Sequence, residues 1–414
     1  MDVRRKALNI GRSAVADMIP DKAVRDSLSD FRPSGRLILV AIGKAAWRMA
    51  HAAWDTLGDR IEGGIVITKD GHAEGAIGPL MIREASHPVV DERALSATEE
   101  ALSLVAGLDA NDTVLFLVSG GGSALFEKPV EGVSLGDLQE ISSHLMNAGG
   151  DIVTLNAVRK RLSRVKGGKF AHVAAPARIE ALILSDVLGD RLDSIASGPA
   201  AADSVTNAQV RETVRRFGLS DNPVIQRALT EETPKSVENV TSRIIGSVSV
   251  LCARTVELLG EAGIPSILLT TRLSGEAREV GQLMAEIAVE IRDSGRPASP
   301  PCAIIAGGET IVHVRGNGLG GRNQEMALGA ALGIAGLENV AFLALASDGT
   351  DGPTDAAGGI VDGGTIERIR SAGIDPLDLL HNNDAYHALD SAGDLVRIGP
   401  TGTNVNDIAV LLVG

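Results

Sequence analysis

TVLFLVSGGG, residues 113–122, decides the fold, because six apolar or β-branched residues end at a serine followed by three glycines. A short apolar run bounded by such a turn signal is typical of a buried strand. Three other runs in the N-terminal half also lead into glycine or small polar residues: LILVAIG from Leu37, GIVITKDG from Gly64 and ALILSD from Ala181. The four runs predict the strands of one buried sheet.

Helical periodicity separates these strands, for example in 94–108 and 135–148. Strands that alternate with helices predict an α/β fold with a Rossmann-like, doubly wound sheet. Ligands of such sheets bind at the carboxyl ends of the strands. We therefore look for the site in the segments that directly follow each apolar run.

A polar stretch, TEETPKSVENVTS at 230–242, interrupts this alternation and predicts a domain boundary. The expected domains are 1–236 and 237–414. Apolar runs resume beyond the boundary in RIIGSVSVLCA, SILLTTR, CAIIAGGET, VAFLALASDG and DIAVLLVG. The alternating TIVHVRG at 310–316 predicts a half-exposed strand, and hence a second α/β domain with a mixed sheet.

Composition and charge restrict the class of protein. The chain has 414 residues, of which 44% are apolar and 2% aromatic, and a formal net charge of −14, which disfavours nucleic acid as a partner. Its two cysteines, Cys252 and Cys302, fit a reducing compartment. The N-terminus lacks a secretory apolar region and no run of 18 apolar residues occurs, so we expect a cytoplasmic protein without a membrane partner.

A basic segment stands out in this acidic chain. NAVRKRLSRVKGGK, residues 156–169, holds six positive side chains and no carboxylate. Crowded cations predict an anion ligand. We expect Asn156 and Arg159 to bind substrate, and Lys166 and Lys169, which flank two glycines, to bind phosphate. An ordinary solvated helix face is the alternative.

Glycines after two of the strands suggest a phosphate site. Ser119, Gly120, Gly121, Gly122 and Ser123 can bring backbone N–H groups close to a phosphate, although a tight turn explains the same glycines. Lys44 follows the run LILVAIG and precedes a helical segment, so its ammonium is expected near a helix N-terminus beside a bound anion. A surface lysine is the alternative.

Carboxylates follow other strands. Asp186 and Asp190 in SDVLGD suit the acceptor of a hydroxyl proton or a ligand of Mg²⁺, as phosphoryl transfer requires. Asp348 and Asp351 follow VAFLALAS, and Glu309 follows CAIIAGG. Magnesium ligands, helix caps and Asp-Gly turns remain open for these residues.

The segment GNGLGGRNQE contains a formal G-x-G-x-x-G pattern at 316–321. A dinucleotide site expects an acidic residue about 20 positions further on, and only Glu338 and Asp348 are candidates. The match is weak. Arg322, directly after the glycines, is better interpreted as a clamp for a carboxylate or phosphate, with Glu309 as its partner or as a metal ligand.

Taken in order, eight motifs resemble the glycerate 2-kinases of the class whose C-terminal part is called the MOFRL region. The resemblance covers roughly Leu37 to Val413. The motifs are AIGKAA, ASHPVVDE, LVSGGGSAL, NAVRKRLSRVKGGK, LSDVLGDRLDSIASGP, AGGETIVHVRGNGLGGRNQE, ASDGTDGPTDAAGG and GPTGTNVNDI.

This resemblance implies phosphorylation of D-glycerate to 2-phosphoglycerate by ATP with Mg²⁺, in a cleft between two α/β domains. The family's motifs place its lysine on Lys44, its arginine on Arg322 and its carboxylates on Asp186 and Asp190. Asp190, Glu309, Asp348 and Asp351 are the expected metal ligands. Because such proteins are also labelled hydroxypyruvate reductases, an NAD(P)H-dependent reductase is the alternative, and a non-catalytic sensor of phosphorylated sugars is the third. The oligomeric state stays open, a homodimer included.

Overall fold

The computed structural model describes residues 2–414, which form two compact units. One unit is Pro20–Ile245, and the other joins the chain up to Ile19 with Gly246–Gly414. This division differs from the expected 1–236 and 237–414. The reason is helix α1 (Val3–Asp17), whose apolar residues recur at helical spacing and pack on the C-terminal unit. At Gly11 the helix lies so close to the sheet that an added Cβ would be 2.3 Å from Leu343 Cδ2.

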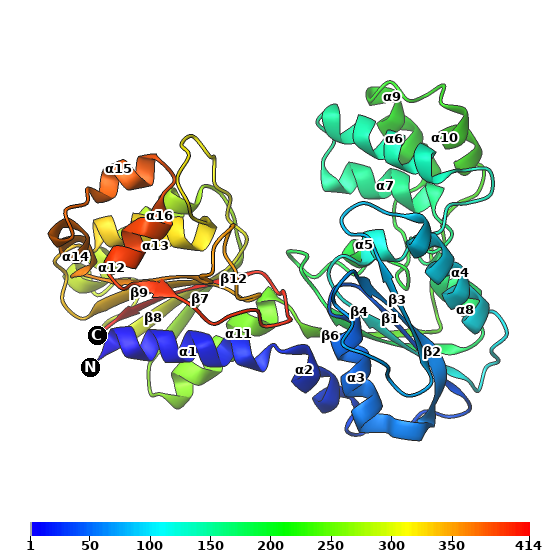
Figure 1. Ribbon diagram of the computed structural model, residues 1–414, viewed down its shortest axis with the longest axis horizontal. Coiled ribbons are helices and arrows are strands. Elements are labelled where there is room, and N and C mark those ends of the chain that lie inside the picture. The colour runs from blue at the N-terminus through cyan, green and yellow to red at the C-terminus, as the bar shows by residue number, and fades with distance from the viewer. Residues whose placement is uncertain (1) are drawn as a thin grey trace. The chain divides into compact units, whose positions relative to one another are not determined.

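The N-terminal unit contains a six-stranded sheet in the order β3-β2-β1-β4-β5-β6, and β1 to β5 are parallel (Figure 1). Alternate residues of β1 point into two separate apolar cores, one beneath α2 (Pro20–Leu28) and α3 (Ala46–Leu57) and the other beneath α4 (Glu92–Val105) and α8 (Lys169–Ala174). The predicted doubly wound sheet is confirmed. Its strands are β1 (Leu37–Ile42), β2 (Ile61–Lys69), β3 (Leu80–Ala85), β4 (Thr113–Val118), β5 (Arg178–Leu184) and β6 (Val240–Gly246).

Helices of the N-terminal unit fall into two groups. The first covers the sheet: α2 (Pro20–Leu28), α3 (Ala46–Leu57), α4 (Glu92–Val105) and α8 (Lys169–Ala174), with the short α5 (Gly122–Leu125) after β4. The second group packs around an apolar core of its own (Figure 1). It consists of α6 (Leu135–Asn147), α7 (Ile152–Leu162), α9 (Asn207–Arg216) and α10 (Pro223–Ala228).

The C-terminal unit contains a second six-stranded sheet, in the order β11-β10-β9-β12-β8-β7. Strands β7 and β8 are parallel and the other pairs are antiparallel, so the predicted mixed sheet is confirmed. Its strands are β7 (Ser266–Leu273), β8 (Cys302–Gly308), β9 (Val340–Ala346), β10 (Gly358–Asp362), β11 (Leu395–Val396) and β12 (Asp407–Val413). Its remaining helices are α11 (Val248–Glu261), α12 (Ala277–Ser294), α13 (Arg322–Gly333), α14 (Thr365–Ser371), α15 (Pro376–His381) and α16 (Ala385–Ser391).

One expected strand beyond the predicted boundary is only partly correct, and another is wrong. The run RIIGSVSVLCA changes from strand to helix, because the side chain of Ser247 accepts the backbone N–H of Val250 and caps α11. The alternating segment 310–316 is mostly irregular, and Ile311 makes only an isolated bridge with Glu276. Val314 is 74% exposed, so the alternation there does not mark a buried face.

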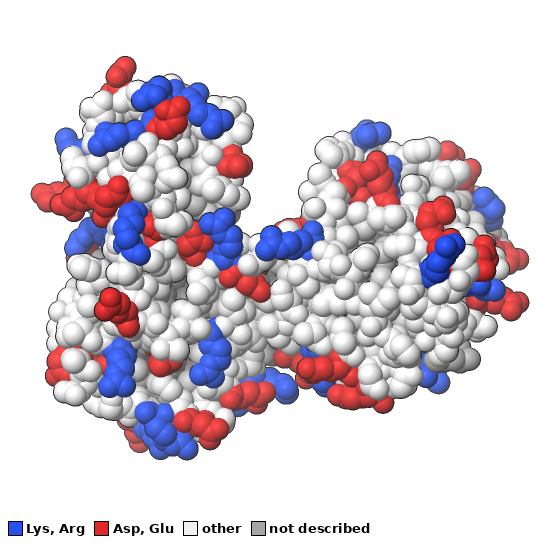
Figure 2. Space-filling model, turned by 180° about the vertical axis from the view of Figure 1, so that it is seen from behind, with Lys and Arg blue, Asp and Glu red and all other residues white. Residues whose placement is uncertain are grey.

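Acidic and basic side chains are interspersed on the face drawn in Figure 2. Exposed pairs such as Arg83 with Glu100 (2.8 Å) and Arg93 with Asp70 (2.6 Å) contribute only about 0–1 kcal/mol each. The fold therefore depends mainly on its apolar cores. Within residues 2–414, no helix is both long and apolar enough to cross a bilayer.

Candidate functional site

The glycine loop, residues 119–123, lies where the order of the parallel strands reverses. Strand β1 is followed in the chain by β2 on one side of it, whereas β4 lies on the other side, and Ile42 is paired with Val118. Both strands therefore end at the same edge of the sheet, which is where ligands of doubly wound folds bind. The glycine loop and the segment after β1 therefore lie where the sequence predicts a ligand site.

Backbone and hydroxyl contacts fix this loop against the segment after β1. The hydroxyl of Ser119 accepts the N–H of Ala45 (3.0 Å) and donates to the carbonyl of Ile42 (3.2 Å). The N–H of Lys44 donates to the carbonyl of Gly120 (2.8 Å). The two segments are thus held together by buried hydrogen bonds and form one rigid edge.

The Lys44 side chain is available for a ligand. Its ammonium forms no hydrogen bond or ion pair with any residue in the described range 2–414. Its carbonyl, in contrast, lies 2.8 Å from Nδ1 of His72, which must carry the proton because a carbonyl only accepts. The backbone of Lys44 is therefore fixed, while its half-buried side chain carries an ammonium without a protein partner in the described range.

Asp186 and His87 approach the glycines closely. A Cβ added to Gly120 would lie 2.4 Å from Oδ2 of Asp186. Gly121 has a φ of +86°, and a Cβ there would lie 3.1 Å from Nε2 of His87 and 3.2 Å from Cγ of Lys44. Only glycine combines this backbone conformation with such neighbours. Among the predicted residues, the structure brings together Lys44, the glycine loop and Asp186.

A strained segment joins the other end of the loop. Asp190, Ala196 and Ser197 have positive φ values of 54°, 50° and 62°. Such conformations cost about 1–3 kcal/mol each for residues other than glycine and cluster at functional sites. The Ser197 hydroxyl lies 2.9 Å from that of Ser123 and donates to Oδ1 of Asn156 (3.1 Å). Asn156 is thereby connected to the glycine loop.

The predicted phosphate-binding role of Lys166 does not fit its surroundings. Lys166 is fully buried, donates to the carbonyls of Ser123 (2.9 Å) and Phe126 (3.0 Å), and pairs with Glu127 (2.9 Å). Burial lowers the pKa of Lys166, and Glu127 opposes this effect. The side chain fixes the chain that follows the glycine loop instead of facing a ligand.

Lys169 is also occupied within the protein. Its ammonium donates to the carbonyls of Lys160 (3.0 Å), Arg161 (3.4 Å) and Ser163 (2.6 Å), at the C-terminal end of α7. Burial lowers the pKa of Lys169 to about 8. Because it satisfies carbonyls that a helix end leaves without partners, its role is structural.

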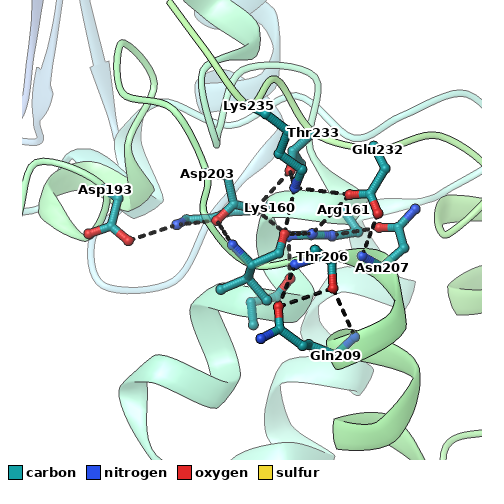
Figure 3. Close-up of polar contacts among 12 residues, drawn as sticks. Lys160, Arg161, Asp193, Asp203, Thr206, Asn207, Gln209, Glu232, Thr233 and Lys235 are labelled. Atoms are coloured by element: carbon teal, nitrogen blue, oxygen red, sulfur yellow. Dashed lines mark hydrogen bonds and ion pairs between the residues drawn. The ribbon is translucent and has the colours of Figure 1, made fainter.

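The acids missing from the basic segment come from elsewhere in the chain. Lys160 donates to Asp203 (3.0 Å), and the Arg161 guanidinium pairs with the other oxygen of this carboxylate (Figure 3). Thr233 also donates to Asp203 (2.8 Å). Burial alone would raise the pKa of Asp203, but its partners, Lys160 foremost, lower the pKa overall. Three cations of this segment, Lys160, Arg161 and Lys166, are therefore held in buried ion pairs.

Replacing Asp203 with alanine should lower the free energy of unfolding by about 3–5 kcal/mol, because Lys160 and Arg161 would lose their nearest counter-ion and keep only the longer contacts to Asp193 and Glu232 (3.6 Å each). Denaturant unfolding monitored by circular dichroism measures this loss. Glu212→Ala removes an exposed carboxylate paired with Arg215 and serves as the control, with an expected change below about 1 kcal/mol. Equal stability of the two variants would contradict the interpretation.

Arg159 differs from its neighbours in the basic segment. It is half-buried, and its Nε donates to the hydroxyl of Ser142 (3.2 Å). Burial lowers the pKa of Arg159, and Glu127 raises it. Because no carboxylate forms an ion pair with it within residues 2–414, Arg159 remains a candidate for binding an anion.

Arg322 is the first residue of α13 in the C-terminal unit. Its Nε and Nη2 donate to the two oxygens of Asp407 (2.5 and 3.2 Å), and its Nη1 donates to Glu309 (2.7 Å). Burial raises the pKa of Asp407 to about 6, although Arg322 opposes this effect. The predicted partnership of Arg322 with Glu309 is found. Asp407 was missed, although GPTGTNVNDI contains it.

Two predicted metal ligands, Asp351 and Asp348, accept hydrogen bonds from backbone N–H groups. Both carboxylate oxygens of Asp351 accept N–H groups of α13, from Asn323 (3.1 Å) and Gln324 (2.8 Å). Burial raises the pKa of Asp351, and these N–H groups oppose it. Asp348 accepts the N–H of Thr350 (3.0 Å), as in an Asx turn. Within residues 2–414, no group of three or more His, Cys, Asp or Glu residues is placed to hold a metal ion.

Comparison with known proteins gives consistent matches along the whole chain. Residues 6–230 match the family model described as "Domain of unknown function (DUF4147)", and residues 302–407 match the MOFRL family. The D-glycerate 2-kinase of Thermotoga maritima is 49% identical over 99% of this chain and 98% of its own length. A protein of Agrobacterium vitis called a putative hydroxypyruvate reductase is 40% identical over 100% of this chain and 95% of its own length. The crystal structure of glycerate kinase from Thermotoga maritima matches with a TM-score of 0.96, over 99% of both chains at 49% identity.

Proposed function

This chain belongs to the glycerate 2-kinase family that carries a DUF4147 domain and a MOFRL region, and we propose that it phosphorylates D-glycerate. The γ-phosphoryl group of ATP is transferred to the C2 hydroxyl, giving 2-phosphoglycerate and ADP. The observation that carries this proposal is the 49% identity to a D-glycerate 2-kinase over nearly the full length of both chains. The enzyme is therefore a phosphotransferase with an alcohol acceptor.

The residues around the glycine loop support this chemistry. Phosphoryl transfer depends on positioning and on neutralising the charge of the phosphoryl oxygens. Gly120 and Gly121 let backbone groups approach a phosphate, and the Lys44 ammonium next to them has no protein partner in the described range. Asp186, whose carboxylate lies against Gly120, accepts the hydrogen bond of the attacking hydroxyl and orients it.

Arg159 and Asn156 are proposed to bind an anionic or hydroxyl group of the substrate. Arg159 keeps no ion pair within the described chain and, unlike Lys169, is not saturated by backbone carbonyls, and Asn156 is fixed by Ser197. Arg322 of the C-terminal unit binds an anionic substrate group, which requires exposed Glu309 to release its Nη1. Asp407 then holds the guanidinium in place.

Magnesium, when bound, neutralises the charge of the nucleotide phosphates. It usually keeps one or two carboxylates together with phosphate oxygens and water, so it does not need a cage of protein ligands. Asp190, Glu309 and Asp348 are the proposed carboxylates. Asp351 fits this role poorly, because both of its oxygens already accept backbone N–H groups.

Phosphorus NMR after incubation with D-glycerate, ATP and Mg²⁺ tests the proposal. We expect the phosphate resonance of 2-phosphoglycerate together with ADP. A parallel incubation with hydroxypyruvate and NADH, followed by absorbance, tests the reductase named in one relative. NADH oxidation without glycerate phosphorylation would replace the proposed activity with the reductase.

A further inference from the structure

Three neighbouring parallel strands lead to basic side chains at the same edge of the N-terminal sheet. Strand β1 leads to Lys44, β2 ends at Lys69 and leads to His72, and β3 leads to His87. We call these four residues the basic cluster. Two of its members lie beside Gly121, whose added Cβ would be 3.0 Å from Cδ2 of His87 and 3.2 Å from Cγ of Lys44.

The register of the strands holds the cluster together. Lys69 is paired with Ala85, two residues before His87. Nδ1 of His72 donates to the Lys44 carbonyl (2.8 Å). The pKa of His87 is lowered first by burial and then by electrostatic interaction with Lys44, Lys69 and His72, so the neutral form of its imidazole is favoured.

No carboxylate forms an ion pair with the Lys44 or Lys69 ammonium within the described residues 2–414, and the ring of His87 makes no hydrogen bond there. Cations that are crowded together without counter-ions repel one another. The repulsion among these cations is unfavourable by itself, and an anion bound beside them reduces this repulsion. The basic cluster thus has the charge pattern that was first expected of residues 156–169.

Nearby carboxylates have other partners. Glu84 on β3 accepts the backbone N–H groups of His72 and Ala73 (both 3.1 Å). Asp70 forms a bidentate ion pair with Arg93, whose Nη1 and Nη2 donate to its two carboxylate oxygens (2.6 and 2.8 Å).

Two further carboxylates complete the surroundings. Asp91 caps α4 through the N–H of Ala94 (3.0 Å) and also accepts from Arg93 (2.8 Å). Asp186 lies against Gly120, the neighbour of the glycine that His87 and Lys44 contact.

We propose that the basic cluster is the subsite for the phosphoryl groups of the nucleotide, and that His87 takes up a proton from solvent when they bind. The inference rests on the proposed function, since it names the residues that receive the triphosphate. A phosphate next to His87 favours the imidazolium, which can then donate a charge-assisted hydrogen bond to a phosphate oxygen. Lys69 and Lys44 supply the fixed positive charges.

Binding should therefore depend on pH in a defined direction. Burial and the neighbouring charges lower the pKa of His87 in the free protein, and a phosphate bound next to it would raise this pKa. Affinity for ATP then increases as the pH falls from 8 toward 6, and one proton is taken up in this range. The dependence ends below the pKa of the free protein, where His87 is already charged.

Calorimetric titration with ATP and Mg²⁺, without glycerate, measures the proton uptake directly. The titration is run at pH 7 in two buffers of different ionisation enthalpy, so that the difference in observed heat gives the protons bound. We expect the wild type to take up more protons than His87→Gln, whose affinity becomes nearly independent of pH. His51→Gln changes a surface histidine on α3 paired with Asp55, and it should match the wild type.

A second variant tests the fixed charge. Lys69→Met should weaken ATP binding by about tenfold, because one charged contact to phosphate is lost. Equal proton uptake by the wild type and His87→Gln, or unchanged affinity in Lys69→Met, would overturn the subsite.

The outcome is separable from that of the proposed function. ATP binding with His87-dependent proton uptake but without 2-phosphoglycerate would support the subsite and refute the kinase. Phosphorylation of glycerate by the wild type, together with unchanged ATP binding in His87→Gln and Lys69→Met, would support the kinase and refute the subsite.

Discussion

Replacing Lys44 with alanine is expected to lower kcat by about 10²–10³-fold while the protein remains folded. The ammonium has no protein partner in residues 2–414, so its removal breaks no stabilising contact, whereas the Lys44 backbone bonds to Gly120 and His72 remain. Its charge is therefore available for the phosphoryl group in the transition state. Initial rates at saturating D-glycerate and ATP measure the effect.

Lys22→Ala provides the matched control for Lys44→Ala. Lys22 lies on α2 of the same unit and pairs with Asp26 on the surface (3.4 Å). We expect wild-type turnover from this variant and unchanged circular dichroism from both. A Lys44→Ala enzyme with wild-type kcat would exclude Lys44 from the chemistry, whatever its effect on the binding of ATP.

Replacing Arg322 with glutamine is expected to reduce turnover and also to destabilise the C-terminal unit by about 2 kcal/mol. Breaking a buried ion pair costs about 3–5 kcal/mol, and the Arg322 side chain is 32% exposed, so a smaller loss is expected. The loss arises because Asp407 remains buried without its partner. Kinetics and denaturant unfolding measure the two effects separately.

The double variant Arg322→Gln with Asp407→Asn separates stability from function. Removing the buried carboxylate should restore most of the stability, whereas activity should stay low because the guanidinium is still absent. Recovery of activity in the double variant would show that Arg322 only neutralises Asp407 and does not bind substrate.

Asp407 also predicts a pH effect on stability. Its pKa is raised from about 3.8 to about 6 on folding, so the folded state binds more protons between these values. The contribution of this residue to the free energy of unfolding therefore decreases as the pH rises from about 4 to 6. Subtracting the stability of Asp407→Asn from that of the wild type at each pH should reveal this slope.

The sheets and the glycine loop could be predicted because their signals are local. Strands β1, β4 and β5 are short apolar runs that end at glycine or serine, and the parallel topology brings these ends together. That rule predicts Lys44 and Asp186 as site residues, because they come just after β1 and β5. The substrate was predicted only from the family resemblance, because the spacing of apolar residues carries no information about which molecule is bound.

The roles within the basic segment could not be predicted because charge pairing is not local. Lys160 and Arg161 find their counter-ion in Asp203, 43 and 42 residues away, and Lys166 finds Glu127. A run without acids in the sequence is therefore no evidence of unpaired charge in the fold. The placement of His87 and Lys69 could not be predicted for a similar reason, since only the pairing of β1 with β2 and of β2 with β3 brings them to Lys44.

Helix α1 is translated well before the elements that cover its apolar face. Val3, Ala7, Ile10 and Ala14 are buried in the unit formed by 246–414, and all of 20–245 is synthesised in between. Contacts between segments so distant in the chain form slowly. The N-terminal unit can thus complete folding during translation, whereas α1 must wait for β9 and β12. A fragment that begins after Ile19 would leave the α1-binding surface open and should be prone to aggregation.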